Sequence, residues 1–209
     1  ATVVDVDGHS YVDLCLGDTG AMTGHAPSAT VAAVAEQAAR GITTMLPSED
    51  GPWVAEELRR RFGLPRWQIA MTATDANRFV IRIARHVTGR QRVLVMNWCY
   101  HGTVDEALWV LDGAGEVVPR PGTVGPLDAT AGAVAVVEFN DISGAERELA
   151  RGDVALVLLE PALTNIGIVL PEPGYHATLR RLTRDHGTLL CIDETHTICV
   201  GPGGATREW

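Results

Sequence analysis

The stretch VALVLLEP, residues 154–161, joins six consecutive apolar residues to a carboxylate. A run of this kind is typical of a strand that is covered on both faces, as the strands of parallel sheets are. Shorter runs of similar character occur at Val93–Met96, Val134–Val137 and Thr188–Ile192. Helical patterns separate these runs, at Thr74–Val87 and Pro173–His186. The alternation predicts an α/β fold, with a mostly parallel sheet and helices on both faces.

The N-terminal residues predict smaller elements. Val3–Asp7 and Tyr11–Leu16 flank a glycine-containing turn, which is typical of a hairpin. Ser28 can cap a helix that runs to Arg40. The remaining expectations are a second helix that follows Asp50-Gly51-Pro52 and stops at Gly63, and a short strand at Trp67–Met71. We therefore expect a short N-terminal segment, residues 1–50, ahead of a larger domain, residues 51–209.

The charged residues limit the possible chemistry. The chain of 209 residues has 26 Asp and Glu against 17 basic residues, and every basic residue is arginine. Without lysine, no residue of the chain can act as an amine nucleophile, a Schiff-base lysine or a phosphate-loop lysine. The net charge of −9 and the scattered arginines argue against a nucleic-acid surface, which needs clustered positive charge.

The sequence also indicates the compartment. No apolar stretch reaches the ~18 residues of a membrane span, and the N-terminus lacks the pattern of a signal peptide. Cys15, Cys99, Cys191 and Cys199 stand far apart, with no C-x-x-C pair, which is typical of reduced thiols. We expect a cytoplasmic protein with no membrane contact.

In open α/β sheets, ligands bind beyond the carboxyl ends of the strands. Four polar segments occupy such positions: Thr72–Asn77, Asn97–Gly102, Glu160–Gly167 and Asp193–Thr197. The first segment begins a helix, and could bind a phosphate through free N–H groups and a hydroxyl. Alternatively, Thr74 or Asp75 only caps that helix.

The other three segments leave similar alternatives open. Tyr100 and His101 could stack on a planar ligand or belong to a packed loop. Glu160 either needs a partner in a site or is solvated at the sheet edge. Asp193 ends an apolar strand, so its carboxylate needs a cation, which could be a protonated heteroaromatic nitrogen or an arginine of the chain.

Taken together and in order, these segments resemble class III, fold type I pyridoxal-phosphate aminotransferases, especially the branch around glutamate-1-semialdehyde aminomutase. The matching motifs are Asp5-Val6-Asp7-Gly8-His9-Ser10-Tyr11-Val12-Asp13, Thr72-Ala73-Thr74-Asp75-Ala76, Cys99-Tyr100-His101-Gly102, Glu160-Pro161 with Asn165 and Gly167, and Asp193-Glu194. The resemblance covers nearly the whole chain. Two departures are Ala73, where the family has glycine, and Ile198-Cys199-Val200, where it has Gly-Phe-Arg.

The resemblance implies pyridoxal 5'-phosphate as the cofactor. Ala73 and Thr74 would hold its phosphate, and Asp193, the catalytic residue within the chain, would pair with its pyridine nitrogen. The other cofactor-site residues that it implies are Tyr100 and Thr195 on the ring, His196 near the phenolic oxygen, and His101, Glu160 and Asn165 around them. The chemistry fits, because a carboxylate at Asp193 keeps the ring cationic and electron-accepting.

The resemblance further implies a homodimer that acts on a small amino acid, amine or keto acid. Residues 1–50 would belong to a small domain and to dimer contacts, and Thr43–Ser48 is a candidate to reach the partner's site. The large domain would be incomplete at its C-terminus, because the Schiff-base lysine would lie past Trp209. We therefore expect an enzyme as the parent protein and no activity from these 209 residues alone. Asp18 would disfavour a substrate carboxylate, which favours transamination over the aminomutase reaction.

Three alternatives come from other classes. A metal site could combine Cys191 and Asp193 with His196 and Cys199, and Cys99 and His101 could complete it, but the spacing matches no standard zinc signature, so we expect no metal. Cys99 and His101 could form a nucleophile pair, although residues two apart in a loop rarely meet and no orienting carboxylate is evident. The third alternative is a truncated or degenerate, non-catalytic chain.

Overall fold

The computed structural model describes residues 1–125, 127 and 129–208. The chain divides into two compact units, Ala1–Trp67 and Gln68–Trp209, and each is described by itself. The boundary expected between residues 50 and 51 falls inside the first unit. The assignment of residues 1–50 to a small domain stays a prediction.

The first unit holds a hairpin and two helices. β1 (Thr2–Val4) pairs antiparallel with β2 (Ser10–Val12), as predicted. The helices α1 (Ser28–Arg40) and α2 (Asp50–Phe62) confirm the two predicted ones, although α2 begins at Asp50 and not after Pro52 as expected. The expected cap at Ser28 is wrong by one position, because Ser28 is already helical and Pro27 is the cap residue.

The second unit is built on a four-stranded parallel sheet. Its order is β6-β3-β7-β8, formed by β6 (Val134–Val137), β3 (Arg92–Met96), β7 (Val154–Leu159) and β8 (Leu189–Ile192). All six residues of β7 are buried, as the continuous apolar run predicts for a central strand. The predicted α/β sheet is confirmed.

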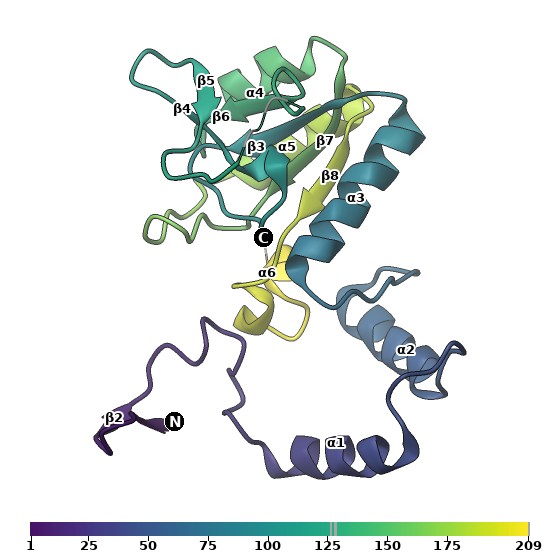
Figure 1. The fold of residues 1–209 in the computed structure, drawn as a ribbon. Helices are drawn as coiled ribbons and strands as arrows, with labels where there is room; N and C mark the ends of the chain where they lie inside the picture. Colours follow the sequence, from purple (N-terminus) through teal and green to yellow (C-terminus); the bar gives the residue numbers. More distant parts are fainter. Residues whose placement is uncertain (126, 128, 209) are drawn as a thin grey trace. The chain divides into compact units, whose positions relative to one another are not determined.

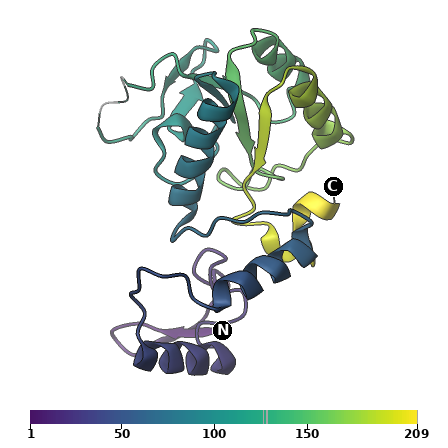
Figure 2. The ribbon, with the colours of Figure 1, turned by 90° about the vertical axis from the view of Figure 1, so that its right-hand side faces the viewer.

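Helices cover both faces of this sheet. α3 (Ala73–Thr88) lies on one face, and α4 (Ile142–Leu149) and α5 (Tyr175–Asp185) pack against each other on the opposite face (Figures 1 and 2). The smaller elements are a 3-10 turn (Asp105–Ala107), β4 (Trp109–Leu111) paired with β5 (Val117–Pro119), a second 3-10 turn (Ile198–Val200) and α6 (Ala205–Glu208). The parallel order brings the carboxyl ends of the strands to one edge of the sheet.

α3 packs on the sheet through a face that the sequence did not single out. Phe79, Ile83 and Val87 follow the helical period, but all three are exposed. The buried face carries Ile81 and Ala84 instead, with the polar Asn77 one turn before them. A polar side chain on the inward face of a helix needs hydrogen-bond partners.

One predicted strand is wrong. Trp67–Met71 has no strand geometry and pairs with no strand in the described part of the chain, and Ile69 and Met71 are exposed. A strand is stable only when a neighbour satisfies its backbone groups. The β-favouring residues of this segment therefore do not make it a strand without a neighbouring strand to pair with.

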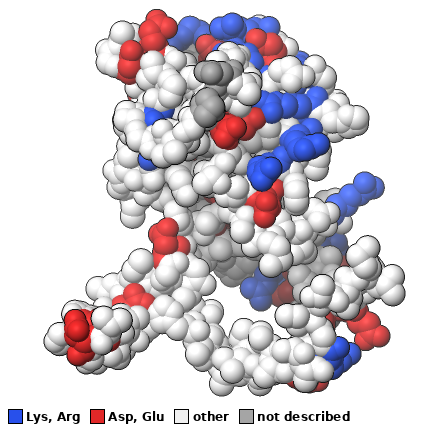
Figure 3. Space-filling view, in the orientation of Figure 1, with Lys and Arg blue, Asp and Glu red and all other residues white. Residues whose placement is uncertain are grey.

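Charges of both signs cover the second unit. Figure 3 shows arginines interspersed with acidic side chains on the face that it presents. Arg92 pairs with Glu148 at 2.8 Å and with Asp153 at 3.2 Å, and Arg85 pairs with Glu106 at 2.7 Å. Within the described residues, no helix combines the length and the apolar character that a membrane crossing requires.

Candidate active site

The three loops after β3, β7 and β8 meet at the carboxyl edge of the sheet, beside the start of α3. The register pairs Leu159 with Ile192, so Glu160 and Asp193 follow at the ends of neighbouring strands. The Asp193 amide extends the ladder by donating to Leu159 O at 2.8 Å. Hydrogen bonds join residues of the four predicted segments at this edge.

The Asp193 carboxylate is the centre of one network. Its Oδ2 accepts from Asn77 Nδ2 at 3.0 Å and lies 2.9 Å from His101 Nδ1. Its Oδ1 accepts from the Thr195 amide at 3.0 Å and from the Thr195 hydroxyl at 2.6 Å. Within the described part of the chain, the cationic partner of this carboxylate is the imidazole of His101 and not an arginine.

The two central groups shift each other's titration. Burial by itself lowers the pKa of His101, which is 1% exposed, but the adjacent Cys99 and the bond to Asp193 more than offset this and raise the pKa to about 10. Burial likewise raises the pKa of Asp193, and hydrogen bonds from His101, Thr195 and Asn77 outweigh it and hold the pKa well below its usual range. The pair is therefore ionised at neutral pH, with a carboxylate that attracts cations.

The start of α3 lies against the loop that follows β3. Thr72 caps the helix, because its hydroxyl accepts from the Asp75 amide at 3.1 Å, so the expected cap role of Thr74 or Asp75 is wrong. Thr74 instead accepts from the Thr103 amide at 3.2 Å. Ala73 opens the helix with ordinary helical backbone, so the family's glycine is not needed at this position.

Gly102 permits the close contact between the start of α3 and the loop after β3. Its φ of +77° is in the left-handed region, and a Cβ there would lie 2.0 Å from Thr74 Oγ1. A side chain at this position would push the loop away from α3. Gly102 thus holds the Tyr100–His101 loop next to the helix start.

The remaining predicted residues lie on the surface of the same region. Tyr100 is 48% exposed, so its ring is open to a ligand. Asn165 is exposed and donates from Nδ2 to Trp98 O at 3.0 Å, which connects the loop after β7 to the loop after β3. Trp98 itself has a φ of +61°, a conformation that costs energy for a bulky residue and marks a constrained loop.

A second network, which we name the imidazole relay, consists of Glu160, Thr164 and His196. The Thr164 hydroxyl donates to Glu160 Oε2 and lies 2.6 Å from His196 Nδ1. His196 Nδ1 is 3.9 Å from the same carboxylate oxygen. Glu160 is buried, so the alternative of a solvated carboxylate at the sheet edge is wrong.

Two residues of these networks were not predicted as site residues. Asn77 carried a usable signal, because it is a polar residue in register with Ile81 and Ala84 on one face of α3. Thr164 stands four residues after Glu160 in an irregular loop, and nothing in the sequence indicates that its hydroxyl meets His196.

The alternative of a Cys–His nucleophile requires one correction. An orienting carboxylate does exist, because Asp193 holds His101 Nδ1. However, the Cys99 side chain is buried, which withholds its sulfur from a substrate.

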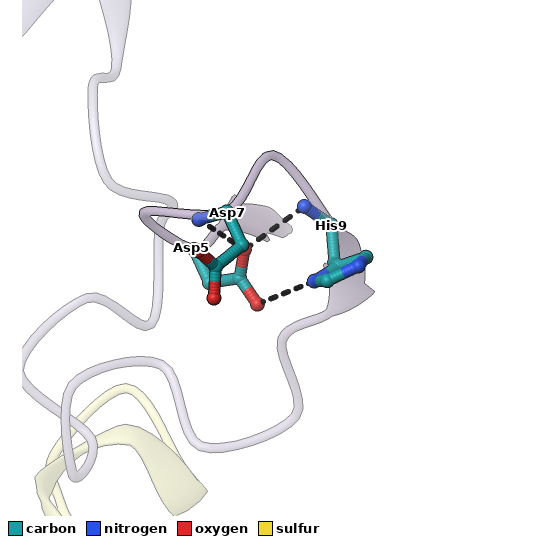
Figure 4. A group of neighbouring side chains, drawn as sticks. All are labelled: Asp5, Asp7 and His9. Atoms are coloured by element: carbon teal, nitrogen blue, oxygen red, sulfur yellow. Dashed lines mark hydrogen bonds and ion pairs between the residues drawn. The ribbon is translucent and has the colours of Figure 1, made fainter.

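The cysteines and histidines of the alternative metal site do not form a group of close ligand atoms in the part of the chain that the structure describes. Burial raises the pKa of Cys191 to about 12, which disfavours the thiolate that a metal needs. Among the described residues, the one group of close ligand atoms is Asp5, Asp7 and His9, at the β1–β2 turn (Figure 4). These side chains are exposed, and Asp5 Oδ1 accepts from the amides of Asp7 and His9. They serve to close the turn.

The sequence profile of one family, described as Aminotransferase class-III, matches residues 1–206. The chain belongs to the class III aminotransferase family. The resemblance inferred from the motifs is thereby confirmed.

Relatives of this class III aminotransferase chain have been named and solved. A glutamate-1-semialdehyde 2,1-aminomutase of Desulfitobacterium hafniense is 35% identical over 213 residues, covering 100% of this chain and 50% of the relative. The crystal structure of a glutamate-1-semialdehyde-aminomutase from Pseudomonas aeruginosa PAO1 superposes with a TM-score of 0.96 at 54% identity, covering 100% of this chain and 46% of that one. An omega-transaminase from Sphaerobacter thermophilus gives 0.90 at 32% identity, with 100% and 50% covered.

These superpositions confirm the fold type I class for this aminotransferase chain. The chain spans about half the length of the curated relatives it matches. What the full protein binds and transforms is therefore treated below as a proposal.

Proposed function

We propose that this protein is a pyridoxal-phosphate-dependent enzyme that transfers an amino group between small amino acids or amines and keto acids. The observation that carries the proposal is the partly buried Asp193 carboxylate, 2.9 Å from the imidazole of His101 at the carboxyl edge of a parallel sheet. Support for the cofactor also comes from a variant of the Pseudomonas aeruginosa enzyme, which was solved in complex with PMP.

The residues present fit this cofactor. Its phosphate needs donors, and the first turn of α3 offers the amides of Ala73 and Thr74 at the positive end of the helix. Its ring nitrogen needs a carboxylate, which Asp193 supplies. Oδ1 of Asp193 can receive the ring N–H if the Thr195 hydroxyl rotates away, while the Thr195 amide stays bonded.

When bound, the cofactor supplies an electron-accepting ring for the charge left by proton loss next to the substrate amino group. Asp193 would keep the ring nitrogen protonated, and His101 and Asn77 hold that carboxylate in place. Tyr100 would cover the ring, with Thr195 on the ring, and His196, Glu160 and Asn165 would border the reacting side. None of the 209 residues can provide a lysine amine.

An aminomutase reaction is the second candidate, and a specific observation favours it. The relatives at 54% and 35% identity both carry the name glutamate-1-semialdehyde aminomutase. The argument for transamination rests on Asp18, which is exposed in the first unit with a φ of +52°. Isomerisation of an amino aldehyde with no added amino acceptor would decide for the aminomutase.

A cytoplasmic homodimer is part of the same proposal. Apolar side chains of the first unit are exposed, with Leu46 at 78% and Trp53 at 71%, and burial of such groups drives association. Met45 and Leu46 lie in Thr43–Ser48, the segment expected to reach the partner. All four cysteines are free thiols, as in a reducing compartment. Sedimentation of the full-length protein at micromolar concentration should give a dimer, and a monomer would contradict the proposal.

The activity is tested on the full-length protein. Titration with pyridoxal phosphate should produce a shifted cofactor absorbance and saturable binding. A panel of amino donors with keto-acid acceptors should then give turnover, measured as product formed. Binding without any turnover, in either the transamination or the isomerisation assay, would favour the non-catalytic alternative.

A further inference from the structure

The proposed function places His196 and Glu160 beside the cofactor but does not use Thr164 or the hydrogen bonds that join the three residues of the imidazole relay. Its members come from two loops, since Glu160 and Thr164 follow β7 and His196 follows β8. They form a continuous path from a buried carboxylate through a hydroxyl to an imidazole. The His196 side chain is 23% exposed, whereas that of Glu160 is 6% exposed, so the path leads from the interior towards an accessible ring.

Glu160 defines the direction of the hydrogen bonds. Its residue is 5% exposed, and its second oxygen, Oε1, has no hydrogen-bond partner within the described part of the chain. Burying a carboxylate is costly unless donors meet it. The Thr164 hydroxyl donates its proton to Oε2.

The single hydroxyl proton of Thr164 then determines which ring nitrogen of His196 carries the hydrogen. A hydroxyl has one proton to donate, and Thr164 uses it on Glu160. At 2.6 Å, Oγ1 can therefore only accept from Nδ1, which must carry a hydrogen. When the ring is neutral, the lone pair is on Nε2.

We propose that Glu160 and Thr164 are positioning residues that hold His196 as the Nδ1–H tautomer, so that Nε2 accepts a proton from an N–H or O–H group of the bound ligand. The inference rests on the proposed function for the identity of that ligand, the cofactor or its amino substrate. The proton passes to Nε2, and the electron pair stays on the ligand atom. Nδ1 keeps its hydrogen, and Glu160 Oε2 lies 3.9 Å from it, on the side opposite to Nε2.

The tautomer is measured directly by long-range ¹⁵N–¹H NMR on the full-length protein labelled at histidine, with no cofactor added and with the ring neutral. His196→Asn assigns the signal by its loss. Wild type and Thr164→Ser, which keeps the hydroxyl, should both show Nδ1–H. Thr164→Val, which removes the hydroxyl at nearly constant volume, should lose this preference, and Thr164→Ala provides a second variant without the hydroxyl.

Two results overturn the relay: an Nε2–H signal in wild type, or an Nδ1–H signal that survives in both Thr164→Val and Thr164→Ala. Pyridoxal phosphate is then added, followed by an amino substrate. The Nε2 resonance of His196 should move with one of them in wild type, and an unmoved resonance with the cofactor bound overturns the acceptor role. If no cofactor absorbance develops at all, the proposed function fails, while the tautomer result still decides the relay.

Discussion

His101 Nδ1 lies 2.9 Å from Asp193 Oδ2, although 92 positions separate the two residues in the chain. The imidazole is fully buried, and the carboxylate side chain is 9% exposed. Each group is costly to bury as an ion without the other. The pair therefore ties the loop after β3 to the end of β8.

Removing the imidazole should destabilise the protein strongly. His101→Leu leaves the Asp193 charge without its cation, and the free energy of unfolding should fall by about 3–5 kcal/mol in urea titration. His86→Leu is the matched control, because His86 is exposed on α3, and its effect should stay within about 0.5 kcal/mol. Equal losses for the two variants would show that the ion pair contributes little.

Stability should also depend on pH through the same pair. The pKa of His101 is raised from 6.5 to about 10, so its contribution is complete below 6.5 and is lost as the pH rises towards 10. The pKa of Asp193 is lowered from 3.8, so its contribution is present above 3.8 and is lost as the pH falls below that value. The ion pair should therefore contribute most to the free energy of unfolding between pH 3.8 and pH 6.5.

Urea titrations at several pH values check this expectation. Wild type should lose up to about 1.4 kcal/mol per pH unit on the alkaline side, the slope for one proton. His101→Gln keeps a donor but cannot titrate, so its slope should be smaller by that amount. Parallel slopes for the two proteins would mean that His101 is neutral in the fold.

The contact between Gly102 and Thr74 predicts a local steric effect. Gly102→Ala combines a positive φ with a Cβ 2.0 Å from Thr74 Oγ1, whereas Gly89→Ala has a similar φ of +69° and nothing within 4 Å. The control should cost about 1–2 kcal/mol, and Gly102→Ala about 1–3 kcal/mol more. Gly102→Ala should also weaken pyridoxal-phosphate binding, measured by absorbance titration, while Gly89→Ala leaves it unchanged. Equal losses of stability and equal cofactor binding in the two variants would exclude a role for the close contact between Gly102 and Thr74.

The sheet was predictable because its strands are continuous apolar runs. VALVLLEP at residues 154–161 became β7, with every residue of the strand buried and Glu160 at its carboxyl end. A similar run placed Asp193 after β8, but the expectation that this strand is buried on both faces is wrong, because β8 lies at the edge of the sheet and none of its residues is fully buried. Local sequence was sufficient for β7, because burial on both faces leaves a clear pattern.

The partners of the site residues were not predictable in this way. The sequence required a cation for Asp193, but the choice of His101 depends on how β3 and β8 align in the sheet and on the loop bend at Gly102. The inward face of α3 was mistaken for a similar reason, because Phe79 and Ile83 follow the same period as Ile81 and Ala84. Only tertiary packing distinguishes two apolar stripes on one helix.

The central claim is that Asp193 holds the ring nitrogen of the cofactor in its protonated form. The most direct measurement is the ¹⁵N chemical shift of ring-labelled pyridoxal phosphate bound to the full-length protein at about pH 8, compared with Asp193→Asn and with the exposed control Asp185→Asn. We expect a protonated nitrogen in wild type and Asp185→Asn, and an unprotonated nitrogen or loss of binding in Asp193→Asn. An unprotonated nitrogen in wild type, or a protonated one that persists in Asp193→Asn, would contradict the claim.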